Sequence, residues 1–211
     1  MKIAVIGASG KSGSLIVKEA IARGHDVTAI VRNPNAHVDP KAKILVKDLF
    51  DLTYEDLKPF DVIIDAFAAW TPETLPQHQT SLKHLTDILS GKPNRLLVVG
   101  GAGSLYVNPE HTIRLVDSPD FPDEFKPLAN NMAKALDQLR TCNDVNWTYL
   151  SPAIEFIADG PRTGHYIVGG EQILVNSQGK SQISYADYAI AMIDEAENAK
   201  HIKQRFTVAT K

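Results

Sequence analysis

Short apolar runs alternate along the chain with segments whose apolar residues recur at helical spacing. The apolar runs predict strands at Lys2–Gly7, Asp26–Arg32, Ala42–Asp48, Asp61–Ala68, Asn94–Gly101, Val145–Pro152 and Arg205–Thr210. The periodic segments predict helices at Ser12–Gly24, Tyr54–Phe60, Leu75–Leu89, Pro127–Arg140 and Tyr185–Asn198. Strands that alternate with helices are joined by right-handed crossovers, so the pattern predicts an α/β fold with a doubly wound parallel sheet.

Length, charge and cysteine content narrow the class of protein. The 211 residues favour one domain over residues 1–211, and the net charge of −3 offers no positive surface to nucleic acid or to an anionic membrane. No apolar run is long enough to span a membrane, and a single cysteine excludes an intramolecular disulfide. We therefore expect a cytoplasmic protein that acts on a small molecule, without nucleic-acid or membrane partners and without a metal; the oligomeric state stays open.

The first predicted strand leads into a glycine-rich turn, GASGKSG, with glycines at Gly7, Gly10 and Gly13. In a dinucleotide-binding fold the first glycine allows a tight exit from the strand, the second lets a diphosphate approach the backbone, and the third lets the helix pack close to the sheet. The start of the helix then presents unpaired amides to the phosphates. The other candidate residues of this turn are Ser9, Lys11 and Ser12.

A nucleoside-triphosphate loop is the alternative interpretation of the same turn. The letters GKS end that motif, and Asp65, which follows the apolar run of the fourth strand, could serve as its magnesium-binding acid. That motif also needs a glycine at the place where this chain has Val5, inside the strand. The turn therefore favours the dinucleotide.

The end of the second strand indicates which dinucleotide. An acid there would bind the ribose 2′-hydroxyl and favour NAD, but the strand ends in Arg32. A guanidinium can hold a 2′-phosphate by two parallel hydrogen bonds, and Ser9 and Lys11 could assist. The sequence therefore favours NADP, with NAD possible; a solvated charge at the strand end is the alternative role of Arg32.

Further candidates follow the other strands, at the edge where ligands bind in open α/β sheets. Asp48 could accept a hydrogen bond from the adenine amino group, or it could cap the turn that follows. Small residues after the fourth and fifth strands would let the two riboses approach, while Phe67 could cover one of them. The cofactor-binding candidates at these strand ends are Asp48, Leu49, Ala66, Phe67, Ala68, Gly100, Gly101 and Ala102.

These motifs resemble, in the same order and over most of the chain, the atypical short-chain dehydrogenase/reductase superfamily. The matching stretches are GASGKSGS, IVRNP, KDLFDL, DVIIDAF and LLVVGGAGSL. Residues 161–198 are similar to the tail of small proteins described as NAD(P)H–flavin reductases, kin to biliverdin-IXβ reductase. The resemblance implies a Rossmann fold with a small C-terminal substrate cap at roughly 152–184. It also implies that Ser151, Pro152 and Ile154 border the nicotinamide.

The chain departs from this superfamily at the catalytic motif. Its oxidoreductases usually carry Y-x-x-x-K on the helix after the fifth strand, where the tyrosine donates the proton and the lysine lowers its pKa and holds the ribose. Here Lys134 on that helix follows Asn130, while Tyr54 and Lys58 have the spacing but lie in another element. Lys134, also a candidate for holding the cofactor, and His165 are the remaining catalytic candidates.

The missing tyrosine suits the reduction of a flavin better than the reduction of a ketone. Hydride transfer to FMN, FAD or riboflavin goes to a ring nitrogen of an electron-poor system, and solvent can deliver the proton. We therefore predict an NAD(P)H-dependent reductase of a flavin or a similar planar acceptor. A non-catalytic NADP-binding redox sensor is the alternative, and an isomerase or epimerase that uses bound NADP is a third.

Two segments could supply walls for the substrate. Residues 104–125 form a long stretch without helical or strand periodicity, which is either functional or a structural Ω-loop. Arg162 and His165 are polar groups that could meet a substrate. Trp70 and Trp147 are expected to pack in the core or the cap rather than to stack on a ligand.

Overall fold

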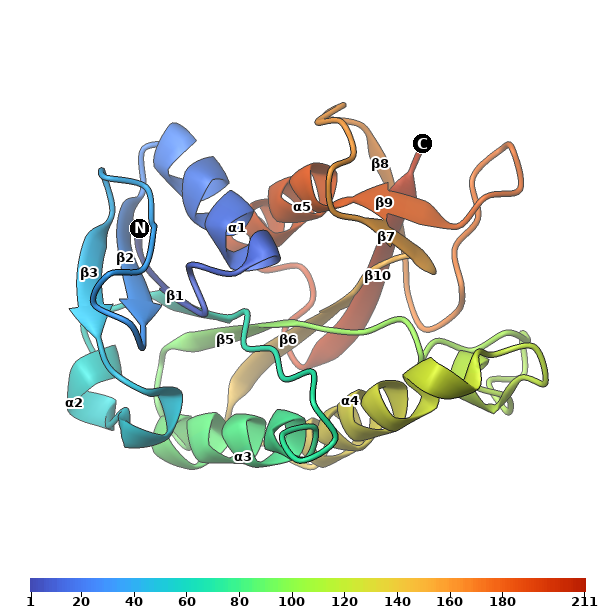
Figure 1. The fold of residues 1–211 in the computed structure, drawn as a ribbon, viewed down its shortest axis with the longest axis horizontal. Helices are drawn as coiled ribbons and strands as arrows, with labels where there is room; N and C mark the ends of the chain where they lie inside the picture. The colour runs from blue at the N-terminus through green and yellow to red at the C-terminus, as the bar shows by residue number, and fades with distance from the viewer.

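A twisted sheet of eight strands forms the centre of the protein in the computed structural model, which describes residues 1–211 (Figure 1). In spatial order the strands are β3 (Lys43–Val46), β2 (Asp26–Val31), β1 (Lys2–Ile6), β4 (Val62–Asp65), β5 (Arg95–Val99), β6 (Asn146–Ser151), β10 (Gln204–Thr210) and β8 (Tyr166–Gly169). All neighbouring pairs are parallel except β10 and β8. The predicted doubly wound α/β fold is confirmed, and the order of the strands reverses between β1 and β4.

Helices cover both faces of this sheet (Figure 1). The helices α1 (Lys11–Ala22) and α5 (Tyr185–Asn198) lie on one face, and α2 (Tyr54–Leu57), α3 (Gln77–Leu89) and α4 (Lys126–Leu139) lie on the other. The strands are buried on both sides, so the apolar core has two parts, one centred on Ile16 and Tyr188 and one on Leu85 and Leu136. Three short 3₁₀ turns, η1 (Leu49–Asp51), η2 (Leu115–Asp117) and η3 (Asp123–Phe125), lie in connections.

The region between β6 and α5 is less regular than the rest. There β7 (Glu155–Ile157) and β9 (Gln182–Ser184) pair in parallel as a separate small sheet, while β8 joins the edge of the main sheet. None of these three strands was predicted, because each has only three or four residues, too few to show a strand pattern. Phe156 of β7 packs on Tyr185 and Tyr188 of α5, with ring centroids 3.8 and 4.8 Å apart. This small sheet is thereby fixed beside the start of α5.

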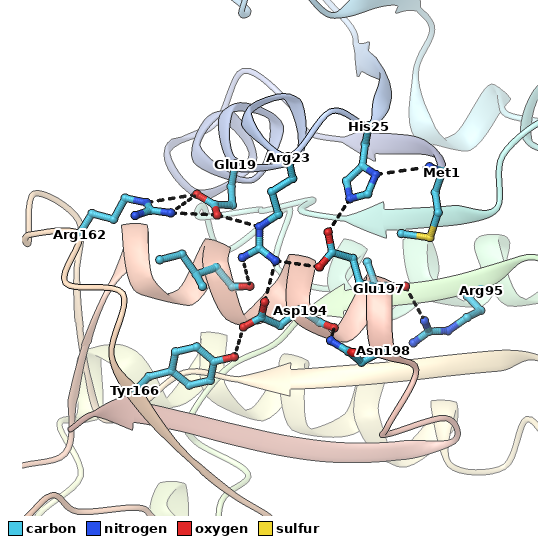
Figure 2. A network of polar contacts seen from close by, with 12 residues as sticks. Met1, Glu19, Arg23, His25, Arg95, Arg162, Tyr166, Asp194, Glu197 and Asn198 are labelled. Atoms are coloured by element: carbon cyan, nitrogen blue, oxygen red, sulfur yellow. Dashed lines mark hydrogen bonds and ion pairs between the residues drawn. The ribbon is translucent and has the colours of Figure 1, made fainter.

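A network of charged side chains joins α1 to α5 (Figure 2). Arg23 donates hydrogen bonds to Glu19 at 2.9 Å, to Asp194 at 2.7 Å and to Glu197 at 2.9 Å. From the segment before β8, Arg162 donates two hydrogen bonds of 3.0 Å from its Nη2 to the two carboxylate oxygens of Glu19. The guanidinium of Arg162, one of the polar groups that could have met a substrate, therefore holds the irregular region against α1.

No helix of the protein combines the length and the apolar character needed to cross a membrane.

A candidate dinucleotide site at the carboxyl edge of the sheet

Two joined hollows lie beyond the carboxyl ends of the parallel strands, at the reversal of strand order between β1 and β4. One, next to β2, has a volume of about 390 Å³, and the other, next to β5, has a volume of about 700 Å³. We call them the β2 hollow and the β5 hollow. Their shared walls are Ser9, Gly10, Ala66, Phe67, Ala68 and Trp70. A long ligand lying across both would therefore pass between the glycine-rich turn and the segment after β4.

The glycine-rich turn is shaped by contacts that side chains would prevent. Gly7 has a φ of +70°, and a β-carbon there would lie 2.5 Å from the carbonyl oxygen of Ala66. A β-carbon at Gly13 would lie 2.2 Å from the carbonyl oxygen of Gly7, so the helix can approach the strand only with glycine at this position. The sequence therefore places the start of α1 directly at the junction of the hollows.

The first turn of α1 offers free backbone donors to a ligand. No side chain caps this helix, and the amides of Lys11, Ser12 and Gly13 have no acceptor in the protein. All three residues line the β5 hollow. Because unpaired amides and the positive end of the helix dipole favour an anion, this turn fits the diphosphate of a dinucleotide.

The β2 hollow carries a free positive charge. Arg32 lies exposed on its wall and forms no hydrogen bond or ion pair, whereas Lys47 on the same wall is paired with Asp56 at 2.7 Å. Asp48 accepts a hydrogen bond from the amide of Phe50 at 2.9 Å and thus caps the turn η1, the second of the two roles considered for it. Arg32 is therefore the free guanidinium on this wall of the site.

Apolar and aromatic side chains dominate the β5 hollow. From α4, Leu128 and Met132 face it one helical turn apart, so this apolar pair has the i, i+4 spacing that a Y-x-x-x-K pair would need. Phe156 and Tyr185 form another wall with stacked, tilted rings, and burial raises the pKa of the Tyr185 hydroxyl, which has no hydrogen-bond partner. The wall accordingly suits a flat apolar ring and contains no paired acid and lysine.

The buried imidazole of His78 holds the segment after β4 in place. Its Nε2 lies 3.0 Å from the carbonyl oxygen and 3.3 Å from the amide nitrogen of Ala69. Burial lowers the pKa of His78, so the ring is neutral near pH 7, and its edge packs against Phe67 with centroids 5.7 Å apart. His78 therefore shapes the wall from behind, and we assign it a structural contact rather than proton transfer.

Most of the predicted cofactor-binding residues lie on these walls. They are Gly7, Ser9, Gly10, Lys11, Ser12, Gly13, Arg32, Asp48, Leu49, Ala66, Phe67, Ala68, Gly100, Gly101 and Pro152. Ala102, Ser151 and Ile154 lie within two positions of lining residues in the sequence but do not line either hollow. The hydroxyl of Ser151 is buried against Arg205 at 3.2 Å, which explains why this side chain is turned away from the site.

Neither catalytic candidate lies in the site. Lys134 is two residues beyond Met132 on α4, which turns it by about 200° to the exposed side of the helix. His165 lies in a separate open hollow with Thr163, Thr210 and Lys211. The helix face and the turn before β8 thus place both candidate groups away from the ligand walls.

Residues 104–125, for which we considered both a substrate wall and a structural Ω-loop, contribute nothing to either hollow. Instead, the backbone of Tyr106 bonds to Glu171 and Ile173 at 2.9 Å, and Arg114 pairs with Asp137 at 2.6 Å. These contacts tie the segment to the connection after β8 and to α4. The structural alternative considered for this segment therefore describes it better.

Several wall residues were not found from the sequence. They are Ile6, Ile30, Val31, Lys47, Phe50, Trp70, Gln77, His78, Val99, Leu128, Met132, Phe156 and Tyr185. Trp147 is buried as expected, but the prediction that Trp70 packs in the core or cap is wrong, since 72% of its surface is exposed. No three side chains of His, Cys, Asp or Glu are placed together to hold a metal ion.

Comparison with known proteins agrees with this geometry. A family described as NAD(P)H-binding matches residues 7–198. The uncharacterized protein YwnB of Bacillus subtilis is 50% identical over 211 residues, which cover 100% of this chain and 99% of that protein. A Streptococcus pneumoniae structure, provisionally described as an NADH-flavin reductase, is 54% identical over all of both chains with a TM-score of 0.96. Another from Bacteroides thetaiotaomicron, provisionally described as an epimerase, is 37% identical over 99% of this chain and 96% of that chain, with a TM-score of 0.86.

Proposed function

Because this chain belongs to the NAD(P)H-binding family, we propose that it is an NAD(P)H-dependent reductase that passes a hydride to a flavin or a similar flat acceptor. The observation that carries the proposal is the wall of the β5 hollow, where aromatic and apolar side chains surround the end of the glycine-rich turn. The neighbour from Streptococcus pneumoniae, with its provisional description as an NADH-flavin reductase, supports the same chemistry.

A nicotinamide dinucleotide would occupy both hollows. The amides of Lys11, Ser12 and Gly13 would hold the diphosphate, and Arg32 would bind a 2′-phosphate in the β2 hollow. The nicotinamide would then lie in the β5 hollow, where the backbone of Gly100 and Gly101 lines the wall after the end of β5. The unpaired guanidinium favours NADP over NAD.

In the proposed reaction the protein's main tasks are to position the nicotinamide and the acceptor ring and to exclude water from between them. When bound, the reduced nicotinamide ring supplies a hydride. Leu128 and Met132 close one side of the hollow without offering a proton, and Phe156 and Tyr185 present flat faces to an acceptor ring. Holding two rings in contact can supply much of the rate acceleration, and the proton can come from solvent.

An epimerase or a redox sensor would use the same cofactor site differently. An epimerase that works through bound NADP needs an acid or base beside the reacting carbon, and α4 presents only Leu128 and Met132 there. A sensor would bind NADP and NADPH and consume neither, so turnover separates it from a reductase.

The test is consumption of NADPH in the presence of FMN, FAD or riboflavin. We expect the absorbance of NADPH at its long-wavelength band to fall much faster with the protein than in the protein-free mixture. Calorimetry with NADPH alone, run on the same sample, reports binding independently of turnover. Binding without acceleration by any flavin would favour the sensor, and no binding would end the proposal.

A further inference from the structure

Trp70 is the most exposed of the large apolar side chains in the protein, with 72% of its surface open to solvent. It lies on the rim where the two hollows meet and lines both of them, as Ser9 and Gly10 do. Its indole nitrogen has no hydrogen-bond partner. Exposure of an indole to water costs free energy in proportion to its apolar area. Its position on the rim of the candidate site therefore points to a contact that forms when a ligand is bound.

The backbone on both sides of Trp70 is fixed. Ala69 is buried, with its amide and its carbonyl oxygen both against the imidazole of His78. On the other side, Thr71 accepts a hydrogen bond from the amide of Leu75 at 3.0 Å and donates one from its own amide to the hydroxyl of Thr74 at 3.2 Å. The side-chain torsions of Trp70 are therefore its free motions, and the indole can swing over the hollows without movement of the loop.

We infer that Trp70 is a side-chain gate that folds over the junction of the hollows and covers the middle of a bound nicotinamide dinucleotide. A ligand that fills both hollows must pass between Ser9–Gly10 and the segment with Trp70, since these are the walls that the hollows share. Covering this point shields the diphosphate and the adjoining ribose from water, which strengthens the bonds from the first turn of α1 and slows dissociation. This inference rests on the proposed binding of the cofactor.

The two tryptophans of the chain make the gate measurable. Trp70 is exposed and Trp147 is only 3% exposed, so acrylamide quenches mainly the first. We expect saturating NADP⁺, which does not absorb tryptophan emission, to reduce acrylamide quenching of the wild-type protein several-fold. In Trp70→Phe the remaining emission comes from Trp147, and its weak quenching should be the same with and without NADP⁺.

Affinity gives the second readout. Trp70→Ala should raise the dissociation constant for NADPH about tenfold, mainly through a faster dissociation rate, as loss of a newly buried indole face predicts. Its melting temperature should equal that of the wild type, because the side chain has few contacts to lose. If calorimetry shows that NADP⁺ binds while Trp70 stays as open to acrylamide as before, or Trp70→Ala binds NADPH normally, the gate is refuted and the cofactor site stands. If neither nucleotide binds to the wild type, the proposed function fails first, and the gate fails with it.

Discussion

The carboxylate of Asp65 accepts a hydrogen bond from the backbone amide of Phe67 at 3.0 Å, and it has no other partner although only 5% of the residue is exposed. Asp65 ends β4, directly behind the wall of the β5 hollow. Burial raises the pKa of this carboxyl to about 6, and the single hydrogen bond opposes the shift only in part. Strand β4 thus ends in an acid whose charged form is unfavourable in the folded state.

This acid should make stability depend on pH. The pKa in the folded state lies above the unfolded value of 3.8, so the folded state binds more protons between these values. The contribution of protonated Asp65 to the free energy of unfolding is therefore complete below about pH 4 and is lost as the pH rises through about 6. Asp65→Asn should therefore raise the free energy of unfolding at pH 7.5 by up to about 3 kcal/mol and change it little at pH 4. Urea unfolding at both values checks this, with Asp120→Asn on the surface as the control; a gain of equal size at both pH values would contradict it.

A substitution at Gly10 tests the binding of the diphosphate without disturbing the fold. It has an ordinary φ of −73°, and a β-carbon there would meet only the carbonyl oxygen of Gly7, at 3.2 Å. Gly10→Ala should therefore fold but place a methyl group where the diphosphate approaches, raising the dissociation constant for NADPH at least about tenfold, or about 1.4 kcal/mol. Calorimetry measures the change. Gly170→Ala is the matched control, because a β-carbon at Gly170 meets nothing within 4 Å; an unaltered affinity in Gly10→Ala would argue against this placement of the ligand.

Arg32 should decide between the two nicotinamide dinucleotides. Removing the guanidinium in Arg32→Ala should weaken NADPH by about 1.5–3 kcal/mol, the size of hydrogen bonds to a charged group, and leave NADH unchanged. Arg32→Lys keeps the charge but loses the planar fork of the guanidinium. Its affinity for NADPH should therefore lie between that of the wild type and that of Arg32→Ala. Parallel titrations with NADPH and NADH supply the measurement. An equal loss of affinity for both nucleotides would show that Arg32 contributes a general positive charge and does not recognise the 2′-phosphate.

The fold could be predicted from local patterns where burial is regular. Helix α5 was predicted with its observed bounds because apolar positions recur along its length at helical spacing. In the structure Ser184 caps it by accepting a hydrogen bond from the amide of Asp187. The glycine-rich turn was predicted because Gly7 and Gly13 are sterically required where they stand. Strands β7 to β9 were missed because each has only three or four residues, which is too short a run to show a strand pattern.

The walls of the site were harder to predict, because they depend on which face of an element meets the ligand. Leu128 and Met132 lie on the same helix as Lys134, and only the packing of α4 on the sheet shows that the apolar pair faces inward. Trp70 is apolar and so suggested a core position, but the bonds that fix Ala69 and Thr71 hold it on a rim. Tertiary contacts of this kind leave no periodic signal in the sequence.

The attachment of α1 to α5 should depend on Arg23, the centre of the network in Figure 2. Arg23→Met leaves the carboxylates of Asp194 and Glu197 without their shared cation, while Glu19 keeps Arg162. We expect the free energy of unfolding to fall by about 2 kcal/mol at neutral pH. Chemical denaturation gives the value.

The control for this change is an exposed ion pair. Lys43→Met removes an exposed lysine of β3 that pairs with Asp26 of β2. Because solvent screens this pair, the free energy of unfolding should change little. Equal effects of the two substitutions would show that the α1–α5 network adds nothing beyond an ordinary surface pair.

Tyr185 gives the sharpest test of hydride transfer without a protein acid. Its hydroxyl is the one phenol on the wall of the β5 hollow, and burial raises its pKa with no lysine beside it to oppose the shift. If solvent delivers the proton to a flavin, as the proposed function requires, Tyr185→Phe keeps the flat ring and should hold kcat within about threefold, well under the 10²–10⁴-fold contribution of a general acid. Phe156→Ala removes stacking surface from the same wall and should raise KM for the flavin instead. A loss of about a hundredfold in kcat for Tyr185→Phe, with NADPH affinity intact by calorimetry, would make this phenol the acid and reject the acid-free mechanism while leaving the cofactor site in place.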